Sequence, residues 1–435
     1  MAAALAFQNS GFSDIHIYES RPESAVVYQP PEESYPIGVN TRGLQSLQEL
    51  ISGGNGSTLD TSRLGSLVSS WKILVTKREW QVANFESGAV HGTTRSTVVQ
   101  ILLEEIKKRE PHITVHYEHS VQDVNASSKT VSLCQKEDES VQVHCDFLVV
   151  ADGHRSRSRD ALAKQSEDLV VHQWPWNITF RVLLSDHSPS SDTTSGKNLD
   201  TNVHYIANRI YLATIPDGRW VAVTSCRSSV KDEQFLLSEE ASDENVRRLK
   251  DHIKNNAPIA QHLFSDKEYR DFFGRVTFTG AVTRISKVLV NGWALILGDA
   301  AHSAIPASGE GVNSSLEDAR VLQKVLMEQR TVGTSNTEQI ATAFETFQER
   351  RLADIHALSE LAYNYANPSV KGKIQSMLIP LCGRLLSRST KLKSETKETM
   401  MFGPSTRDHV SSYSDILREW DMQVKLLGGR PKIPL

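Results

Sequence analysis

The sequence predicts an α/β protein: a sheet covered by helices, interrupted by an inserted antiparallel sheet and followed by C-terminal helices. Three patterns indicate this arrangement. Helical and strand patterns alternate through the first third of the chain, which is typical of a sheet with covering helices. Alternating apolar and polar runs, separated by turn dipeptides, fill residues 170–226, as in an antiparallel sheet. After about residue 314 nearly every segment is helical in pattern, to roughly residue 390, and an irregular polar tail follows.

The composition narrows the class of protein. The chain has 435 residues, enough for one large domain with an inserted one. Its 48 Lys and Arg against 52 Asp and Glu give a net charge of −4, so the charge balance does not indicate nucleic-acid binding. Its four cysteines include no C-x-x-C pair, which argues against a disulfide framework or a metal site. No apolar run approaches the ~20 residues of a transmembrane helix, and no basic flank marks a signal peptide, so we expect a cytoplasmic protein.

The N-terminal pattern indicates part of a nucleotide-binding unit. Residues 2–9 are strong helix formers that end before Gly11, and residues 14–18 alternate as a strand ending at Glu19. In a dinucleotide-binding βαβ unit, such an acid accepts hydrogen bonds from ribose hydroxyls, and a glycine fingerprint lies ~20 residues before it. Counting back from Glu19 passes Met1, so the glycine loop falls outside this chain. The alternative is an ordinary exposed strand-end carboxylate.

A second strand-to-turn junction lies at Asp152 and Gly153. The amphipathic pattern of residues 94–108 predicts a helix before it, and the apolar residues 147–151 predict the strand that leads into the turn. Such a turn lets the backbone approach a pyrophosphate closely, and its aspartate can bond a ribitol hydroxyl or a phosphate-binding arginine. A plain strand-to-helix turn with solvated arginines is the alternative interpretation.

The middle of the chain has the pattern of an antiparallel sheet. Dipeptides at residues 208–209 and 217–218 separate alternating runs and predict β-hairpins. Residues 185–200 are rich in Ser, Thr and Asp and predict an exposed loop. Trp174 and Trp176 either wall a substrate pocket or pack within the sheet, which is the commoner role of such a pair.

The segment from residue 293 to residue 322 combines several features of a binding site. A buried strand ends at Gly298 and Asp299, where the carboxylate can accept a hydrogen bond from a polyol hydroxyl. Gly309 and Gly311 then precede a helix. Its free N–H groups and positive dipole end favour an anionic group, such as a reduced isoalloxazine.

We expect this helix to begin with a capping box formed by Ser314 and Glu317. Helical spacing predicts that its buried face consists of Leu316, Ala319, Leu322 and Leu326. His302, inside the preceding turn, is interpreted as a structural histidine with satisfied hydrogen bonds.

Together these segments resemble the class A FAD-dependent monooxygenases, the aromatic hydroxylase family with the p-hydroxybenzoate hydroxylase fold. The order and spacing fit over about residues 2–365. The positions that match the family's DG motif and second FAD motif are Asp152, Gly153, Gly298, Asp299, Pro306, Gly309, Gly311 and Asn313. A particular similarity to kynurenine 3-monooxygenase-like proteins is carried by residues 37–47, 93–103 and 349–365.

The resemblance implies a Rossmann-like FAD-binding domain and an inserted sheet that contacts the substrate. Glu19 would bind the adenosine ribose, Arg95 would lie near the ribityl or phosphate groups, and Asp299 would bind the ribityl chain. Residues 309–313, with Val312 among them, would line the flavin. NAD(P)H would reduce the FAD, and O₂ would form a flavin hydroperoxide that hydroxylates or epoxidises a small aromatic or other electron-rich organic substrate. The cofactor carries this chemistry, so no side chain is assigned as a catalytic acid or base.

Three departures from the family pattern concern activity and substrate. The family's first strand and glycine fingerprint are absent from the chain. Kynurenine enzymes place an Arg where this sequence has Trp71 and Lys72, and aromatic residues where it has Ala307 and Ser308. The clamp for a kynurenine carboxylate is therefore not predicted, although Asn364 offers a polar contact for a substrate.

Two alternative functions remain open. One is a truncated, non-catalytic paralogue or a binding module on the flavoprotein fold, as in the Rab escort proteins; the absent glycine loop favours it. The other is a flavin-dependent reductase or halogenase. Halogenases of this fold carry a Trp-x-Trp-x-x-Ile stretch, whereas here Ile178 follows Trp176 one position too early.

The motifs also predict the division of the chain. The FAD-binding domain is assigned to residues 1–70, 95–168 and 281–365, the substrate domain to residues 71–94 and 169–280, and a C-terminal helical segment with a tail to residues 366–435. Within that last part, residues 369–393 are basic and amphipathic. A helix packed on the FAD-binding domain is the favoured interpretation, and a peripheral contact with an intracellular membrane is the alternative.

Overall fold

We analysed a computed structural model of the chain. The residues that it describes are 1–53, 58–75, 78–135, 140–186, 199–227, 229–330, 333–366, 375, 410–425, 428–430 and 433. The described part confirms the predicted α/β class. Within it, no helix is long and apolar enough to cross a membrane.

The first third of the chain alternates helix and strand, as its pattern predicts. Helix α1 (Ala2–Asn9) ends at Ser10, and Gly11 follows with φ of +83°. Strand β1 (Ile15–Tyr18) pairs in parallel with β7 (Ile113–His116). A separate sheet of described strands has the order β11 (Leu148–Val150), β19 (Ala294–Ile296), β18 (Leu289–Val290), in which β11 and β19 are parallel.

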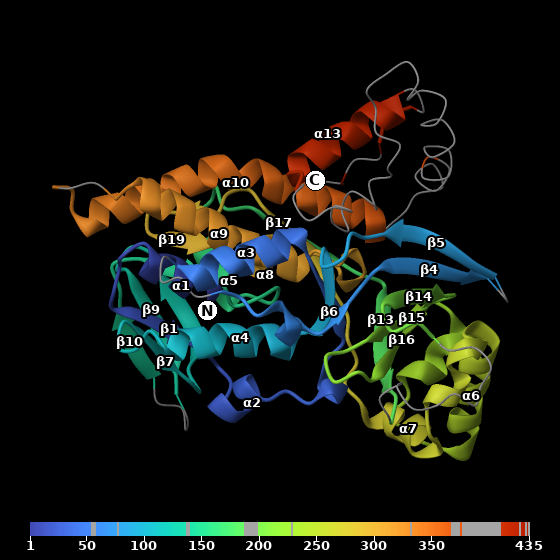
Figure 1. Cartoon of the computed structure of the whole chain (residues 1–435). Coiled ribbons are helices and arrows are strands. Elements are labelled where there is room, and N and C mark those ends of the chain that lie inside the picture. Colours follow the sequence, from blue (N-terminus) through green and yellow to red (C-terminus); the bar gives the residue numbers. More distant parts are fainter. Residues whose placement is uncertain are drawn as a thin grey trace.

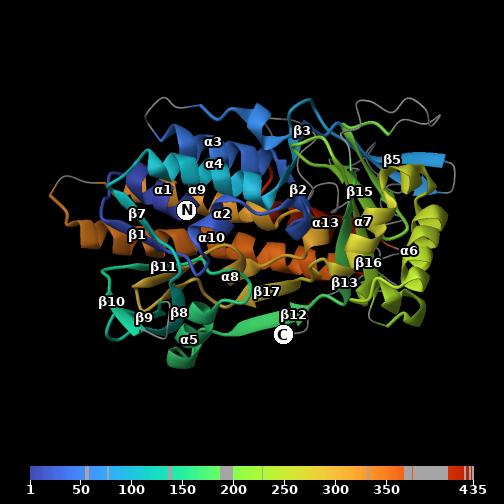
Figure 2. The ribbon, with the colours of Figure 1, turned by 90° about the horizontal axis from the view of Figure 1, so that it is seen from below.

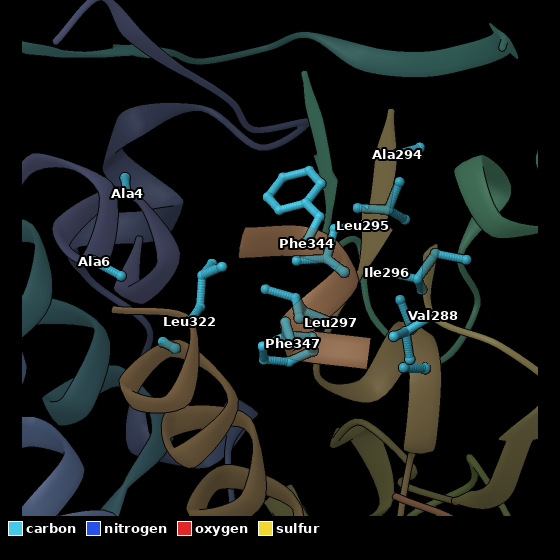
Figure 3. Close-up of a cluster of buried hydrophobic side chains, with 14 of the residues drawn as sticks. Ala4, Ala6, Val288, Ala294, Leu295, Ile296, Leu297, Leu322, Phe344 and Phe347 are labelled. Carbon is cyan, nitrogen blue, oxygen red and sulfur yellow. The ribbon is translucent and has the colours of Figure 1, made fainter. Parts of the chain in front are cut away.

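Helices enclose these strands. They are α2 (Glu23–Val27), α3 (Thr41–Ser52), α4 (Arg95–Lys107), α5 (Arg157–Gln165), α9 (Gly311–Glu328) and α10 (Asn336–Ala366). In Figure 1, α9 and α10 run above the strands, and α4 crosses below α1 and α3. The largest apolar core joins α1, β19, α9 and α10. Figure 3 shows Leu322 of α9 and Phe344 and Phe347 of α10 turned toward this core.

Smaller sheets flank this part of the molecule. An antiparallel meander consists of β8 (Ser120–Asn125), β9 (Thr130–Cys134) and β10 (Ser140–His144). Another small antiparallel sheet has the order β2 (Pro36–Asn40), β6 (Val90–Thr94), β3 (Ser66–Leu67). A two-stranded sheet pairs β12 (Val171–Pro175) with β17 (Ala281–Ile285).

The inserted sheet has six strands in the order β13-β16-β15-β14-β4-β5. Its members are β13 (Ile178–Leu184), β16 (Trp220–Arg227), β15 (Ile210–Thr214), β14 (Val203–Ala207), β4 (Ser70–Val75) and β5 (Arg78–Asn84). The hairpin predicted at Asn208 and Arg209 is confirmed, because both residues have positive φ and connect β14 to β15. Strand β14 pairs in parallel with β4, so this sheet combines two distant parts of the chain.

Helices α6 (Asp243–Asn256) and α7 (Asp266–Asp271) cover one face of the inserted sheet. Figure 1 and Figure 2 both place them at the end of the molecule opposite β9 and β10. Trp220 from the sheet is fully buried in the apolar cluster that also contains Phe272 and Phe273. The predicted exposed loop at residues 185–200 lies largely outside the described residues.

The C-terminal part differs from the expected irregular tail. Helix α13 (Tyr413–Val424) begins after Ser412, whose hydroxyl accepts a hydrogen bond from the N–H of Asp415 at 3.1 Å. Its buried side chains include Ile416 and Trp420, which pack against α10. The predicted irregular tail is therefore wrong for these residues. A capping serine is followed by apolar residues with helical spacing, which is the pattern of an amphipathic helix. The basic segment 369–393 lies outside the described residues except for residue 375.

Candidate functional site

The predicted turn after β19 is built around glycines in the left-handed region. Gly298 has φ of +57° and precedes the short helix α8 (Asp299–His302), and Gly309 has φ of +68° just before α9. Asn313 holds this loop against β2. Its Oδ1 accepts from the N–H of Asn40 at 3.0 Å, and its Nδ2 donates to the carbonyl oxygen of Gly309 at 2.8 Å.

The start of α9 differs from the expected capping box. The helix begins at Gly311 with Glu310 at its N-cap position, so the prediction that Ser314 caps it was wrong. The Ser314 hydroxyl instead donates back to the carbonyl oxygen of Glu310 at 2.8 Å. Glu317 forms an ion pair with Arg42 of α3 at 2.6 Å rather than closing a box. The predicted buried face of Leu316, Ala319, Leu322 and Leu326 is confirmed.

Buried charges tie α9 to the turn that precedes it. Asp318 accepts a hydrogen bond from the N–H of Gly298 at 2.9 Å, and its Oδ2 lies 2.6 Å from Nε2 of His302. Arg351 of α10 donates from Nε to the other oxygen at 2.8 Å and pairs with Glu317 at 2.7 Å. Burial alone would raise the pKa of Asp318, but the charges of His302 and Arg351 lower it to about 2. His302 is therefore paired with Asp318 as a structural histidine, but its buried Nδ1 has no hydrogen-bond partner among the described residues, so the predicted full satisfaction is only half met.

Glu310 is a fully buried carboxyl between the two glycines of the loop. Its Oε1 accepts from Nδ2 of Asn40 at 2.9 Å, and its Oε2 accepts from the hydroxyl of Tyr413 at 2.5 Å. Nε of Arg42 lies 3.8 Å from the same carboxyl. Burial raises the pKa of Glu310 to about 8, although the charge of Arg42 opposes the shift.

The predicted turn at Asp152 is folded by its own aspartate. Asp152 accepts from the N–H of Ser158 at 3.1 Å and from the hydroxyl of Ser156, so it caps the first turn of α5. Gly153 has φ of +85°, the region that favours glycine. This local support explains why the strand turns sharply at the predicted position.

Arg159 joins the two predicted turns. Its buried guanidinium donates from Nη1 to the carbonyl oxygen of Ala300 at 3.1 Å and to that of His154 at 3.3 Å. The Asp299 carboxyl interacts electrostatically with Arg95 at the start of α4 and with His154, but burial is the larger effect and raises its pKa. Arg159 thus joins the turn that contains Asp152 to the turn that follows β19.

Glu19 lies at the end of β1, as predicted, and its carboxylate is engaged. Nε of Arg21 donates to Oε1 at 3.0 Å, and the backbone N–H of Arg21 donates to the same oxygen at 3.0 Å. Burial opposes ionisation, but these bonds outweigh it and lower the pKa of Glu19. Glu19 is therefore a half-buried anion held in a fixed orientation.

The predicted aromatic residues pack near the loop. Trp174 lies edge-on to Tyr363 of α10 with ring centroids 5.4 Å apart, and it shares an apolar cluster with Trp176 and Ile305. Asn364 is buried in α10 and donates to the carbonyl oxygen of its own helix at residue 360, at 2.9 Å. These contacts match the packing role weighed for the tryptophans.

Trp71 is one of the two residues, with Lys72, at which the sequence was expected to depart from the kynurenine-enzyme pattern. It is half-buried in β4, with its ring stacked on His204 at 6.4 Å and edge-on to Phe85 at 5.8 Å between centroids. His204 is fully buried, and its Nδ1 lies 2.6 Å from the hydroxyl of Tyr211. Aromatic and neutral groups therefore surround this position.

Three residues around the candidate site were not predicted from the sequence, because the sequence pattern near each of them indicates its role only weakly. Glu310 stands between two glycines, where a buried acid is unusual. Arg351 is one of two successive arginines in an otherwise amphipathic helix. Tyr413 follows a capping serine in a segment that was expected to be irregular.

Comparisons with known proteins identify the family of the chain. Residues 68–353 match the family model of the FAD binding domain, more than half of the chain. The kynurenine 3-monooxygenase of Debaryomyces hansenii is 27% identical over 388 residues, which cover 85% of this chain and 77% of that protein. The enzyme of the same name from Candida albicans is 26% identical over 379 residues, covering 85% and 78%.

Solved structures show the same fold at lower identity. The tetrameric form of 2-methyl-3-hydroxypyridine-5-carboxylic acid oxygenase superposes with a TM-score of 0.63 at 14% identity, covering 92% of both chains. CtdE, in complex with FAD and a substrate, gives a TM-score of 0.60 at 14% identity and covers 98% of this chain and 96% of that one. The chain belongs to the FAD binding domain family and, within it, to the class A FAD-dependent monooxygenases.

Proposed function

We propose that this chain binds FAD against the Asp299 turn, the Asp152 turn and the N-terminus of α9. With FAD bound, it transfers one oxygen atom of O₂ to a small aromatic or other electron-rich organic substrate, and NAD(P)H supplies the electrons. The observation that carries the proposal is the bond from Arg159 to Ala300, because it fixes the two acidic turns beside each other.

The residues present fit a flavin nucleotide. The first-turn N–H groups of α9 precede the first backbone bond of the helix, from Ser314 to Glu310 at 2.9 Å. They point out of the helix end and suit negative charge. A Cβ added at Gly311 would lie 3.7 Å from Oδ1 of Asp299, and one at Gly153 would meet no described heavy atom within 4 Å. The glycines thus leave the backbone open to a closely approaching ligand.

Three of the predicted residues receive a specific role in this proposal. Asp299 accepts a hydrogen bond from a ribityl hydroxyl, and Arg95 places a cation near the phosphate or ribityl groups. Glu19, fixed by Arg21, accepts a hydrogen bond from an adenosine ribose hydroxyl. FAD, when bound, supplies the electron transfer and the activation of O₂; the protein orients the reactants and excludes water.

We assign the substrate side to the apolar cluster that contains Ile305. Trp174 and Trp176 share its aromatic part with Tyr363 and Tyr365, and Asn364 adds a polar group from α10. The aromatic surroundings of Trp71 support a substrate without a carboxylate at that position. The proposal therefore covers planar, electron-rich molecules and not kynurenine in particular.

Purified protein tests the proposal directly. We expect a yellow protein with about one FAD per chain, NAD(P)H oxidation stimulated by substrate, and one atom of ¹⁸O₂ in the product. Asp299→Asn is expected to weaken FAD binding, while Asp251→Asn, at an exposed carboxylate of α6, serves as the matched control.

Other outcomes would identify the alternatives. NAD(P)H oxidation without incorporation of labelled oxygen would indicate a flavin-dependent reductase. A colourless protein that takes up no added FAD would contradict the proposal and indicate a non-catalytic member of the family.

A further inference from the structure

The carboxyl of Glu310 contacts three separate segments of the chain. The hydroxyl of Tyr413 reaches it from the first residue of α13, and the amide of Asn40 reaches it from the end of β2. Arg42 of α3 approaches within 3.8 Å. Glu310 itself immediately precedes α9, where we propose that FAD binds. A C-terminal helix thus makes a direct hydrogen bond to the cofactor loop.

Arg42 strengthens the same connection. Its guanidinium lies 4.0 Å from the centre of the Tyr413 ring, and its Nη2 donates to the carbonyl oxygen of Ser411 at 2.5 Å. Its Nη1 donates to Glu317 of α9 at 2.6 Å. One arginine therefore holds both the residues that begin α13 and the helix that follows the loop.

We propose that Tyr413 and Glu310 are positioning residues that couple the docking of α13 to the binding of FAD. Helix α13 packs on α10 through apolar contacts, and Tyr413 extends that packing to the cofactor loop. This inference rests on the proposed function, because it concerns the loop that binds FAD. Docked α13 holds Glu310 in place, and Glu310 sets the position of the first residues of α9 and the charge that precedes them.

The charge of Glu310 is sensitive to this contact. The charged and titratable groups that face it are Arg42 on α3, Glu317 on α9 and Tyr413 on α13, and Arg351 of α10 reaches it through Glu317. Burial raises the pKa of Glu310 to about 8, and the hydrogen bond from Tyr413 favours the ionised form. Losing that bond therefore favours the protonated carboxyl just before the positive end of α9.

Coupling of this kind is reciprocal. If docked α13 strengthens FAD binding by a given factor, then bound FAD must strengthen the docking of α13 by the same factor. The two effects have separate readouts, namely the dissociation constant of FAD and the hydrogen exchange of the α13 amides. The dissociation constant reports on the flavin site, whereas the hydrogen exchange reports on α13 itself.

The experiment compares wild-type protein with Tyr413→Phe and Arg418→Ala. Tyr413→Phe removes one hydroxyl, and Arg418 lies on the exposed face of the same helix, so Arg418→Ala is the matched control. We expect Tyr413→Phe to raise the Kd of FAD about tenfold, because it leaves an oxygen of the buried Glu310 carboxyl without its donor. FAD is expected to slow hydrogen exchange of residues 413–424 in wild type and in the control but not in Tyr413→Phe.

A second variant tests the charge of the loop. Glu310→Gln keeps the shape of the side chain but cannot ionise. The Kd of FAD is expected to change between pH 7 and 9 in wild type and to lose this dependence in Glu310→Gln.

Two results would overturn the inference in distinguishable ways. An unchanged Kd in Tyr413→Phe, with FAD-dependent protection of α13 retained, overturns the coupling alone. A wild-type chain that takes up no FAD overturns the proposed function and the coupling together.

Discussion

Arg159 and Ala300 lie 141 positions apart in the sequence, yet the guanidinium of Arg159 donates to the carbonyl oxygen of Ala300 at 3.1 Å. The same Nη1 also donates to the carbonyl oxygen of His154. The side chain is 1% exposed, so neither bond is shared with bulk water. One buried arginine thereby fixes the distance between two turns that come from different strands.

Replacing this arginine is expected to destabilise both turns. Arg159→Met leaves the carbonyl oxygens of Ala300 and His154 without their donor, so we expect a loss of roughly 1.5–3 kcal/mol in the free energy of unfolding. Urea denaturation measures the loss. Arg155→Met, at an exposed arginine of the same turn, is the control, and an equal loss in both variants would contradict this explanation.

Gly43 is expected to tolerate no side chain. A Cβ there would clash with Oδ1 of Asn313 and lie 3.0 Å from Cγ1 of Val39. Helix propensity alone favours alanine by about 1 kcal/mol, whereas overpacking costs about 1–3 kcal/mol. We expect Gly43→Ala to lower the melting temperature, because the clash involves a hydrogen-bonded amide. Gly274→Ala, where a Cβ would meet no described atom within 4 Å, is expected to leave it unchanged.

Asp318 is expected to contribute to stability at neutral pH. Asp318→Asn leaves Arg351 buried without one of its anionic partners, and we expect it to cost about 3–5 kcal/mol at pH 7. The pKa of this carboxyl is lowered to about 2 in the folded state, so its contribution is present above pH 4 and lost as the pH falls toward 2. Denaturation of both proteins at several pH values tests this. A difference that stays constant down to pH 2 would refute the assignment.

His204 is expected to make the protein sensitive to mild acid. Burial lowers the pKa of its imidazole to about 3, well below the ordinary 6.5. The folded state therefore holds this histidine neutral, and the resulting stability is lost as the pH falls from 6.5 toward 3. Thermal melts of wild type and His204→Gln between pH 7 and 4 are expected to converge as the pH falls. His262→Gln, at an exposed histidine, is expected to run parallel to wild type.

The sequence patterns predicted those helix ends, turns and strands whose form depends on residues that are neighbours in the chain. Gly11 marks the end of α1, and Asp299 follows a buried strand, because backbone conformation and strand burial leave direct traces in the sequence. The start of α9 was misplaced, because the Ser314 and Glu317 spacing satisfies the capping-box pattern while a distant arginine, Arg42, engages the glutamate.

The partners of buried charges could not be predicted in the same way. Tyr413 and Glu310 are separated by 103 positions, and nothing near either residue specifies the other. Such pairs follow from how helices pack, and helix packing depends on the whole core. The turns of the candidate site were therefore predictable from the sequence, while the residues that hold them in place were not.

Arg42, Glu317, Arg351 and Asp318 form a buried row in which cations and anions alternate. Glu317 and Arg351, in the middle of the row, each form ion pairs with two neighbours. Replacing any member with a neutral residue therefore leaves an unbalanced charge among buried side chains. The effects of substitutions along this row are expected to be strongly non-additive. For protein engineering, the row is a unit of epistasis: its members cannot be exchanged one at a time, and Asp318 and Arg42 also hold His302 and the carbonyl oxygen of Ser411.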